Sequence, residues 1–548
     1  MKKIHLLLLS LLSGALLWLS WTPNGFAFLV LTAFVPLFFV SEHLYANRVR
    51  HPFWKGLIYS YLTFFVWNVS TTWWIWNSTP EGSIVTFVLN ALFMSMVFGF
   101  WQRFRNLSLP EITMPIAFIA FWCSFEFLHL QWDITWPWLN LGNVFANCPE
   151  FVQWYELTGT FGGTFWILST NFLIFYLLKL LRTSRKRSII LSISCICWIA
   201  LPIAASLVRY TTYQLPDETN RTPIEAVIIQ QNTDPFTEYE FSNVEHIQHI
   251  LEVAAPVLTP QTQIMLCAES AIPNSIVSDA LIANDIPEFN SNYCGFLLLD
   301  SLQQQYPKLN IIAGLSTVCF YDHKATLTAK ELEKDVYMDS YNTSVCYRRN
   351  HIEMYYKSKL VPGVEKMPYP QIFGFLEKYA IDLGGTSGSL GSDSVQRAFT
   401  LTGISAPIGV PICYESAYGE HFGKFVNNGA QLMAVITNDG WWGKTPGYQQ
   451  HFSFSKLRAV ESRRTILRAA NTGTSAFIDE RGDAHQQTEF WTETAIKQKV
   501  YPNDEITFYT KYGDYIARFF VGMTALIFIL GTFLRIRRKF GFKKSIKA

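Results

Sequence analysis

Cys413 has a side chain and a position in the sequence that could suit a nucleophile. It ends the apolar run Val410–Cys413, which predicts a strand, and a helix-like stretch follows it. Such a strand-to-helix elbow presents a side chain while backbone N–H groups point at the same spot. The thiolate is the reactive form of cysteine, and a helix N-terminus or a nearby cation lowers the thiol pKa. For a lone cysteine at a strand end, the alternative is a buried packing residue.

Glu269 and Lys357 have side chains that could assist such a nucleophile, one as a base and one as a cation. Glu269 follows the apolar run Gln263–Ala268, so we expect a partly desolvated carboxyl group, which suits a general base working near neutral pH. Lys357 supplies a cation that can stabilise an oxyanion where water is excluded. The alternatives are an ordinary strand-capping glutamate and a solvated surface lysine.

Together, and in the order Glu, Lys, Cys, these residues resemble the catalytic triad of the nitrilase superfamily. Their flanks are similar to one membrane-bound branch of it, the apolipoprotein N-acyltransferases, and the resemblance covers nearly the whole chain. The segments that carry it are Trp136–Gly142, Gln153–Glu156 with Gly159, Gln230–Asn232, Ala268–Ser270, the block around Lys357, Ile412–Glu415, Thr437–Gly443 and Arg458–Arg464.

The resemblance implies roles for the matching residues. Glu269 would be the general base, Lys357 the oxyanion-stabilising cation and Cys413 the nucleophile that carries the acyl group. The supporting or substrate-binding residues that it implies are Glu365, Tyr414, Glu415, Trp441, Glu461 and Arg464. Trp441 is also typical of an aromatic residue at a lipid interface, and the two roles are compatible.

Two positions near Lys357 depart from the family pattern. Lys359 replaces a histidine, and Pro362–Glu365 replaces a Pro-Phe-Gly-Glu ending, although the offset from Lys357 to Glu365 is kept. The constellation is therefore expected to survive, while the contacts of this loop and the lipid preference stay open.

The resemblance implies an enzyme of lipoprotein maturation. A fatty acyl chain would pass from a membrane phospholipid, through a thioester on Cys413, to the N-terminal amine of a diacylglyceryl-cysteine lipoprotein. No cofactor is expected, and the protein is expected to be a monomer in the inner membrane. The alternatives are a membrane-tethered nitrilase-like amidase and a non-catalytic lipid- or lipoprotein-binding protein.

The composition agrees with a membrane protein. Half of the 548 residues are hydrophobic and only 16% are charged, against about 25% charged residues in a typical soluble domain. The basic residues are scattered among apolar runs, which argues against a nucleic-acid partner. None of the nine cysteines has metal-ligand spacing, so we expect no metal site. A disulfide among Cys267, Cys294, Cys319 and Cys346 stays open.

Eight stretches are long and apolar enough to predict membrane-spanning helices, since roughly 20 apolar residues cross a bilayer. They are Ile4–Trp21, Gly25–Leu44, Trp54–Trp76, Ile84–Trp101, Met114–Leu130, Gly162–Leu181, Ile189–Val208 and Tyr515–Leu534. We interpret the first as an uncleaved helix rather than a secretory signal, because a second span follows almost at once and no convincing cleavage site separates them.

The loops between these spans alternate in charge. Lys and Arg gather at 48–55, 103–105, 182–187 and 535–547, whereas the loops near 22–24, 77–83 and 131–161 contain neither. Because basic loops stay in the cytoplasm, both termini are expected there and the long middle region in the periplasm.

The middle region has the composition of a soluble domain. Its predicted strands are Ala226–Gln230, Gln263–Ala268, Leu309–Leu315, Ser344–Tyr347, Gly409–Cys413, Leu432–Asn438 and Thr474–Asp479, with helices at Tyr239–Val257 and Tyr448–Arg468. This alternation indicates an α/β domain, and the resemblance implies a nitrilase-like α-β-β-α sandwich. We therefore predict a membrane domain at 1–210, a catalytic domain at 211–514, and an eighth helix with a basic tail at 515–548.

Overall fold

The computed structural model describes residues 1–23, 25–105, 110–181, 183–219, 221–282, 291–349, 351–373 and 389–545. The chain divides into two compact units. One is helical and consists of Met1–Arg209 together with Asp514–Ala548, and the other is an α/β unit formed by Tyr210–Gly513.

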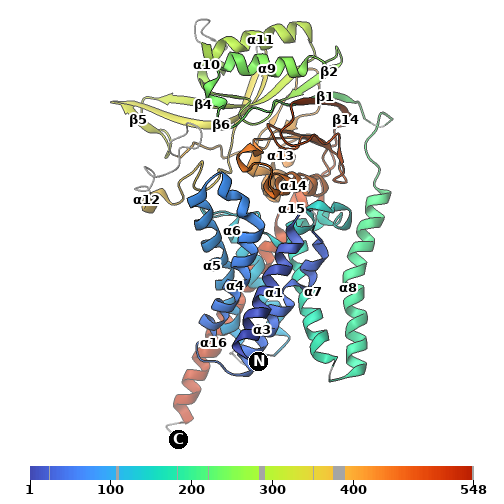
Figure 1. Ribbon diagram of the computed structural model, residues 1–548, viewed down its shortest axis with the longest axis vertical. Helices are drawn as coiled ribbons and strands as arrows, with labels where there is room; N and C mark the ends of the chain where they lie inside the picture. Colours follow the sequence, from blue (N-terminus) through green and yellow to red (C-terminus); the bar gives the residue numbers. More distant parts are fainter. Residues whose placement is uncertain are drawn as a thin grey trace. The chain divides into compact units, whose positions relative to one another are not determined.

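Long helices make up the helical unit (Figure 1). They are α1 (Lys3–Trp21), α3 (Val35–Ala46, preceded by the short α2, Val30–Ala33), α4 (Pro52–Thr72), α5 (Pro80–Arg105), α6 (Thr113–His129), α7 (Tyr155–Leu180), α8 (Arg185–Thr212) and α16 (Tyr515–Ser545). Within the described ranges, six helical stretches are long and apolar enough to cross a membrane, and α6 is apolar but shorter. Six of the eight predicted spans are thereby supported as potential membrane helices.

The interior of this unit is built on aromatic packing. Phe38 and Phe172 stack with ring centroids 4.1 Å apart, and the Phe118 ring meets Phe38 edge-on at 5.4 Å. At the break between α2 and α3, Asn171 accepts from the backbone N–H of Phe34 and donates to the carbonyl of Val30. Polar backbone at such a break must be satisfied within the protein if it lies in lipid.

Two sheets form the centre of the α/β unit. The first has the order β14-β1-β2-β4-β6-β5, with β3 paired to β4 and β7 to β6; the second has the order β13-β12-β11-β10-β9-β8. The first sheet consists of β1 (Ile224–Gln230), β2 (Thr262–Leu266), β3 (Ile272–Val277), β4 (Asn310–Tyr321), β5 (Lys330–Glu333), β6 (Val336–Arg348), β7 (His351–Tyr356) and β14 (Thr494–Val500). The second consists of β8 (Ala398–Phe399), β9 (Ile408–Gly409), β10 (Leu432–Thr437), β11 (Ile466–Ala470), β12 (Ala476–Ile478) and β13 (Ala484–His485).

Helices cover the two sheets, as Figure 1 shows for α9 and α11 above the first sheet and α13 and α14 beside the second. Their bounds are α9 (Asn243–Ala254), α11 (Ser291–Gln305), α13 (Gly419–Asn427) and α14 (Pro446–Ser462). One apolar core joins the sheets, with Ile228 and Leu266 from the first and Ile436 from the second. A second core, including Val227, fills the space under α9 and α11. Because β1 contributes to both cores, its burial is nearly continuous rather than alternating.

The first and last strands of the unit are neighbours. β1 pairs antiparallel with β14, so that Ile224 lies opposite Val500. The chain therefore enters and leaves this sheet at the same end of one strand pair.

Most predicted elements are present, with altered bounds. The helix predicted to run from Tyr448 to Arg468 ends at Ser462, because Arg463 adopts a left-handed conformation and β11 begins at Ile466. The strand predicted to end at Cys413 is formed only at Ile408–Gly409, with an isolated bridge between Ile412 and Ile436.

Candidate active site

The α/β unit brings Glu269, Lys357 and Glu365 into one hydrogen-bonded group, in which Glu269 and Lys357 are buried and Glu365 is partly buried. The Lys357 ammonium lies 3.1 Å from Oε1 of Glu269 and 2.8 Å from Oε1 of Glu365. Lys357 is 1% exposed and Glu269 5%. Burial by itself lowers the pKa of the Lys357 ammonium, but the charges of Glu269 and Glu365 raise that pKa well above its ordinary value. The lysine therefore stays charged in a place where water does not screen it.

Asn342 of β6 orients this group. Its side-chain amide donates to Glu269 at 2.8 Å and to Glu365 at 3.1 Å. Its backbone carbonyl accepts from the N–H of Lys357 at 2.8 Å, just after β7 ends. The sequence prediction missed Asn342, since it lies in the middle of a strand and belongs to no segment of the family pattern.

The second carboxylate oxygen of Glu269 is held from the other sheet. The backbone N–H of Asn438, directly after β10, donates to Oε2 at 2.9 Å. Each oxygen of Glu269 thus has a fixed donor, one set on the first sheet and one on the second. This arrangement fixes the carboxylate between residues of the first sheet and a residue that follows β10 of the second.

Cys413 begins the short 3-10 helix η7 (Cys413–Ala417) and has a left-handed backbone, with φ of 51°. A left-handed conformation is uncommon for a residue other than glycine and marks a position fixed by its surroundings. Burial and then the charge of Glu269 raise the pKa of the Cys413 thiol, while the charge of Lys357 lowers it. Cys413 thus lies at the turn into a short helix, although the strand before it ends earlier than expected. The net shift of the thiol pKa is upward, so ionisation of Cys413 needs a proton acceptor nearby.

Glu415 connects the elbow to the lysine loop. Its Oε2 accepts from the N–H of Ile412 at 2.8 Å, and its Oε1 accepts from the N–H of Ser358 at 2.8 Å and from the hydroxyl of Tyr355 at 2.6 Å. Burial opposes ionisation of this fully buried carboxyl, but hydrogen bonding and the charge of His421 lower its pKa to about 2. Glu415 therefore fastens the segment before Cys413 to the segment after Lys357.

Three of the remaining predicted residues have contacts of their own outside the Glu269 group. Tyr414 is buried with its ring edge-on to Tyr418, and Trp441 lies in η8 (Asp439–Trp442), where its ring meets Phe236 at 5.1 Å. Glu461 of α14 pairs with Arg458 at 3.0 Å.

Arg464 lies at the end of β10 opposite to Asn438. It donates to the carbonyls of Ala430 and Glu505. Ala430 precedes β10, whereas Asn438 follows it, so Arg464 is roughly 25 Å of extended chain from the Glu269 group. These contacts make Arg464 a fully buried cap on loop carbonyls.

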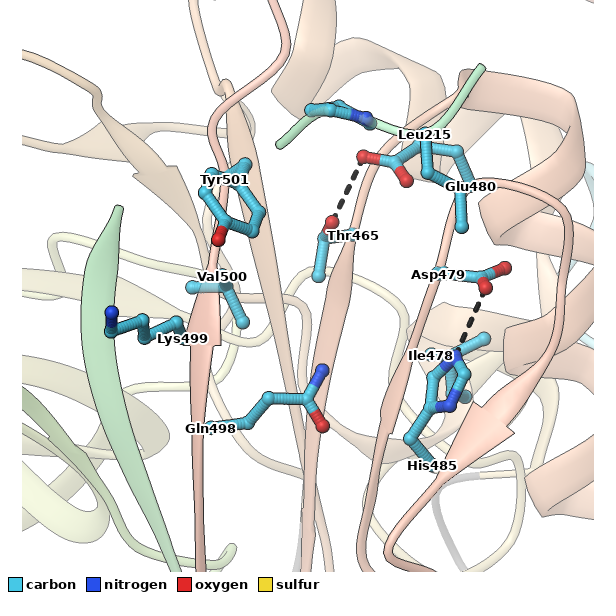
Figure 2. Close-up of a pocket in the computed structure, with 11 residues that line it drawn as sticks. Leu215, Thr465, Ile478, Asp479, Glu480, His485, Gln498, Lys499, Val500 and Tyr501 are labelled. Carbon is cyan, nitrogen blue, oxygen red and sulfur yellow. Dashed lines mark hydrogen bonds and ion pairs between the residues drawn. The ribbon is translucent and has the colours of Figure 1, made fainter. Parts of the chain in front are cut away.

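A separate hollow of about 240 Å³ lies against the second sheet and β14. Figure 2 shows its lining, in which Thr465 donates to Glu480 and His485 meets Asp479. Burial raises the pKa of Glu480 to about 7. The Glu269 group does not line this hollow.

The structure also bears on the cysteines that were considered for a disulfide and on metal binding. Cys267, Cys319 and Cys346 are free thiols, and the side chain of Cys294 lies outside what the structure describes. In the part of the chain that is described, no group of His, Cys, Asp and Glu is arranged to hold a metal ion.

Comparison with known proteins joins the two units to one family. Residues 13–173 match the profile of the apolipoprotein N-acyltransferase N-terminal domain, and residues 228–504 match that of the carbon-nitrogen hydrolases. The apolipoprotein N-acyltransferase of Chlorobaculum tepidum is 27% identical over 95% of this chain and 95% of its own. That of Thermotoga maritima is 25% identical over 96% of this chain and 93% of its own. The chain belongs to the apolipoprotein N-acyltransferase family.

Membership of this family accounts for both halves of the chain. Among solved structures, that of Saccharomyces cerevisiae Nit3, a member of branch 10 of the nitrilase superfamily, is similar to part of this chain: it is 15% identical, with 53% of this chain and 93% of that chain covered and a TM-score of 0.35. The helices that are long and apolar enough to cross a membrane belong to the helical unit, and the carbon-nitrogen hydrolase match falls within the α/β unit. This chain is therefore a membrane protein with a carbon-nitrogen hydrolase part.

Proposed function

We propose that this protein transfers a fatty acyl chain from a membrane phospholipid to the N-terminal amine of a diacylglyceryl-cysteine lipoprotein, through a thioester on Cys413. The observation that supports this most directly is the buried ion group of Glu269 and Lys357 near the Cys413 elbow, in a chain of the apolipoprotein N-acyltransferase family.

The first half-reaction forms the thioester. Glu269 accepts the proton of the Cys413 thiol, and the thiolate attacks the ester carbonyl of the phospholipid. Lys357 stabilises the oxyanion of the tetrahedral intermediate, a contribution worth several kcal/mol, roughly 3, where water is excluded. The ester C–O bond then breaks, and the lysophospholipid alkoxide takes the proton back from Glu269.

The second half-reaction uses the same groups. The neutral amine of the acceptor attacks the thioester carbonyl, and Glu269 accepts the amine proton. When the C–S bond breaks, the proton returns to Cys413, which leaves an N-acylated lipoprotein and the free thiol. Covalent catalysis lets two lipid substrates use one site in turn.

Glu365 has a supporting role in this scheme. It gives Lys357 a second carboxylate partner, so that the lysine keeps its charge and its direction throughout the cycle. Glu415 holds the loop of Lys357 and the elbow of Cys413 in register. No cofactor takes part in the proposed reaction.

We further propose that residues 211–514 face the periplasm of a Gram-negative-type cell, with both termini in the cytoplasm and eight helices in the inner membrane. The alternation of basic and uncharged loops supports this orientation. Leu327 is 90% exposed in the α/β unit, so a Leu327→Cys variant should react with a membrane-impermeant maleimide in spheroplasts. A Lys547→Cys variant should react only after the membrane is opened, and the reverse pattern would invert the topology.

The decisive experiment is mass spectrometry of the detergent-extracted protein after incubation with phospholipid, beside a Cys413→Ser control. We expect a fatty-acyl mass on the Cys413 peptide, which hydroxylamine or a diacylated lipopeptide amine removes. If Cys413 stays unmodified with several phospholipids while the protein remains folded, phospholipid is not the donor. Hydrolysis of a small amide would then favour a membrane-tethered amidase, and no turnover at all a binding protein.

A further inference from the structure

His451 of α14 is a fully buried histidine that contacts the backbone of Cys413. Its Nε2 lies 3.1 Å from the carbonyl oxygen of Cys413. A carbonyl oxygen can only accept a hydrogen bond, so the ring nitrogen is the donor. The hydroxyl of Ser416 also donates to this oxygen, at 2.7 Å, and lies 3.1 Å from the same ring nitrogen.

The other ring nitrogen of His451, Nδ1, also has a buried partner. Nδ1 lies 2.8 Å from Oδ1 of Asp439, and the guanidinium of Arg468 meets Oδ2 of Asp439 at 2.9 Å. Asp439 and Arg468 are both 0% exposed. Burial opposes ionisation of Asp439, but the charges of His451 and Arg468 lower its pKa to about 2. The side chains of Arg468, Asp439 and His451 therefore form one buried polar network that ends at the Cys413 carbonyl.

This contact matters because of the backbone conformation of Cys413. A left-handed non-glycine residue costs roughly 1–2 kcal/mol, and the conformation persists only where the surroundings fix it. A change in the φ angle of Cys413 would move both its carbonyl oxygen and its side chain. The two donors on that oxygen oppose such a rotation.

We propose that His451 is a positioning residue for acyl transfer: by holding the carbonyl of Cys413, it fixes the backbone that presents the thiol to Glu269 and Lys357. Asp439 and Arg468 act through His451 by fixing the ring. This inference rests on the proposed role of Cys413 as the nucleophile.

Two substitutions of His451 separate positioning from plain stability. The amide nitrogen of glutamine lies near the place of Nε2, so His451→Gln keeps a donor for the Cys413 carbonyl. The amide nitrogen of asparagine lies near the place of Nδ1, so His451→Asn keeps the contact with Asp439 and loses the one with Cys413. Each variant keeps one of these two contacts of His451 and loses the other, so we expect similar decreases in the melting temperature.

The full-length protein in detergent is tested for acylation of Cys413 by phospholipid and for its alkylation by iodoacetamide, both followed on the Cys413 peptide. We expect His451→Asn to slow acylation about 30- to 100-fold, since a displacement of 1 Å costs about that much, and His451→Gln to stay within about threefold of the wild type. Equal losses in both variants, in step with their melting temperatures, would overturn the inference.

Two further arms complete the test. Should both histidine variants fail to fold, Ser416→Ala removes the other donor on the same oxygen; an unchanged acylation rate there overturns the inference, and a several-fold loss supports it. If the wild type is alkylated but never acylated by phospholipid, the proposed donor is wrong. The contrast between Asn and Gln in the alkylation rate then still decides the role of His451.

Discussion

Gly314 of β4 passes so close to Glu269 that no larger residue fits between them. A Cβ atom at position 314 would lie 2.6 Å from the Cα of Glu269 and 2.9 Å from the carbonyl oxygen of Ala268. Since both are backbone atoms, no side-chain rotation relieves the clash. The strand that carries no reacting group therefore fixes the position of the carboxylate that we propose as the base.

The substitution Gly314→Ala tests this packing. We expect it to cost about 1–3 kcal/mol of stability, as overpacking usually does, and to reduce the rate of Cys413 acylation about 100-fold through displacement of Glu269. Gly522→Ala is the matched control, because a Cβ there meets nothing within 4 Å. Acylation at the wild-type rate in Gly314→Ala would show that the site tolerates the shift.

Replacement of Lys357 by Met should destabilise the α/β unit strongly. It leaves the buried Glu269 and the partly buried Glu365 without their cation, and loss of the partner of a buried charge typically costs about 3–5 kcal/mol. Thermal unfolding of the full-length protein measures this cost, and acylation of Cys413 should fall below detection. The double variant Lys357→Met/Glu365→Gln should recover much of the stability and none of the acylation. Recovered acylation would exclude Lys357 from the reaction.

The lowered pKa of Glu415 predicts that the protein loses stability in acid. Its pKa lies near 2 in the folded protein, below the ordinary value of 4.5. The group therefore stabilises the fold above about pH 5, and this contribution is lost as the pH falls through about 2. The difference corresponds to about 3 kcal/mol. The melting temperature of Glu415→Gln should be lower than that of the wild type at pH 6, and the gap should shrink toward pH 3; a constant gap would contradict the assignment.

The raised pKa of Glu480 predicts the opposite dependence of stability on pH. Burial raises its pKa from 4.5 to about 7, so the folded state holds a proton that the unfolded chain releases. Its contribution is complete below pH 4.5 and is lost as the pH rises through about 7, again a difference of about 3 kcal/mol. Glu480→Gln should therefore be more stable than the wild type at pH 8 but not at pH 4, with acylation unchanged. Equal pH profiles of the two melting temperatures would refute this.

The order and flanks of Glu269, Lys357 and Cys413, which resemble a known family, singled these residues out of the sequence. The structure brings Glu269 and Lys357 together, and their catalytic roles stay predictions. Asn342 and Gly314 were invisible, since their importance lies in contacts across paired strands that no local pattern encodes.

The helix boundary at Ser462 was missed for a related reason. The residues after it, Ile466–Ala470, are buried on both sides of the second sheet, so an apolar run there fits a strand as well as a helix. Pairing of β11 with β10 and β12 decides between the two, and such pairing depends on residues distant in sequence.

The pairing of Ile224 with Val500 has a consequence for how such a protein can arise. A unit whose two chain ends lie on adjacent strands can be inserted into a loop of another protein, because a short gap in the host suffices to accept it. A free-standing hydrolase of this fold can thus become part of a membrane protein without any change in its strand order.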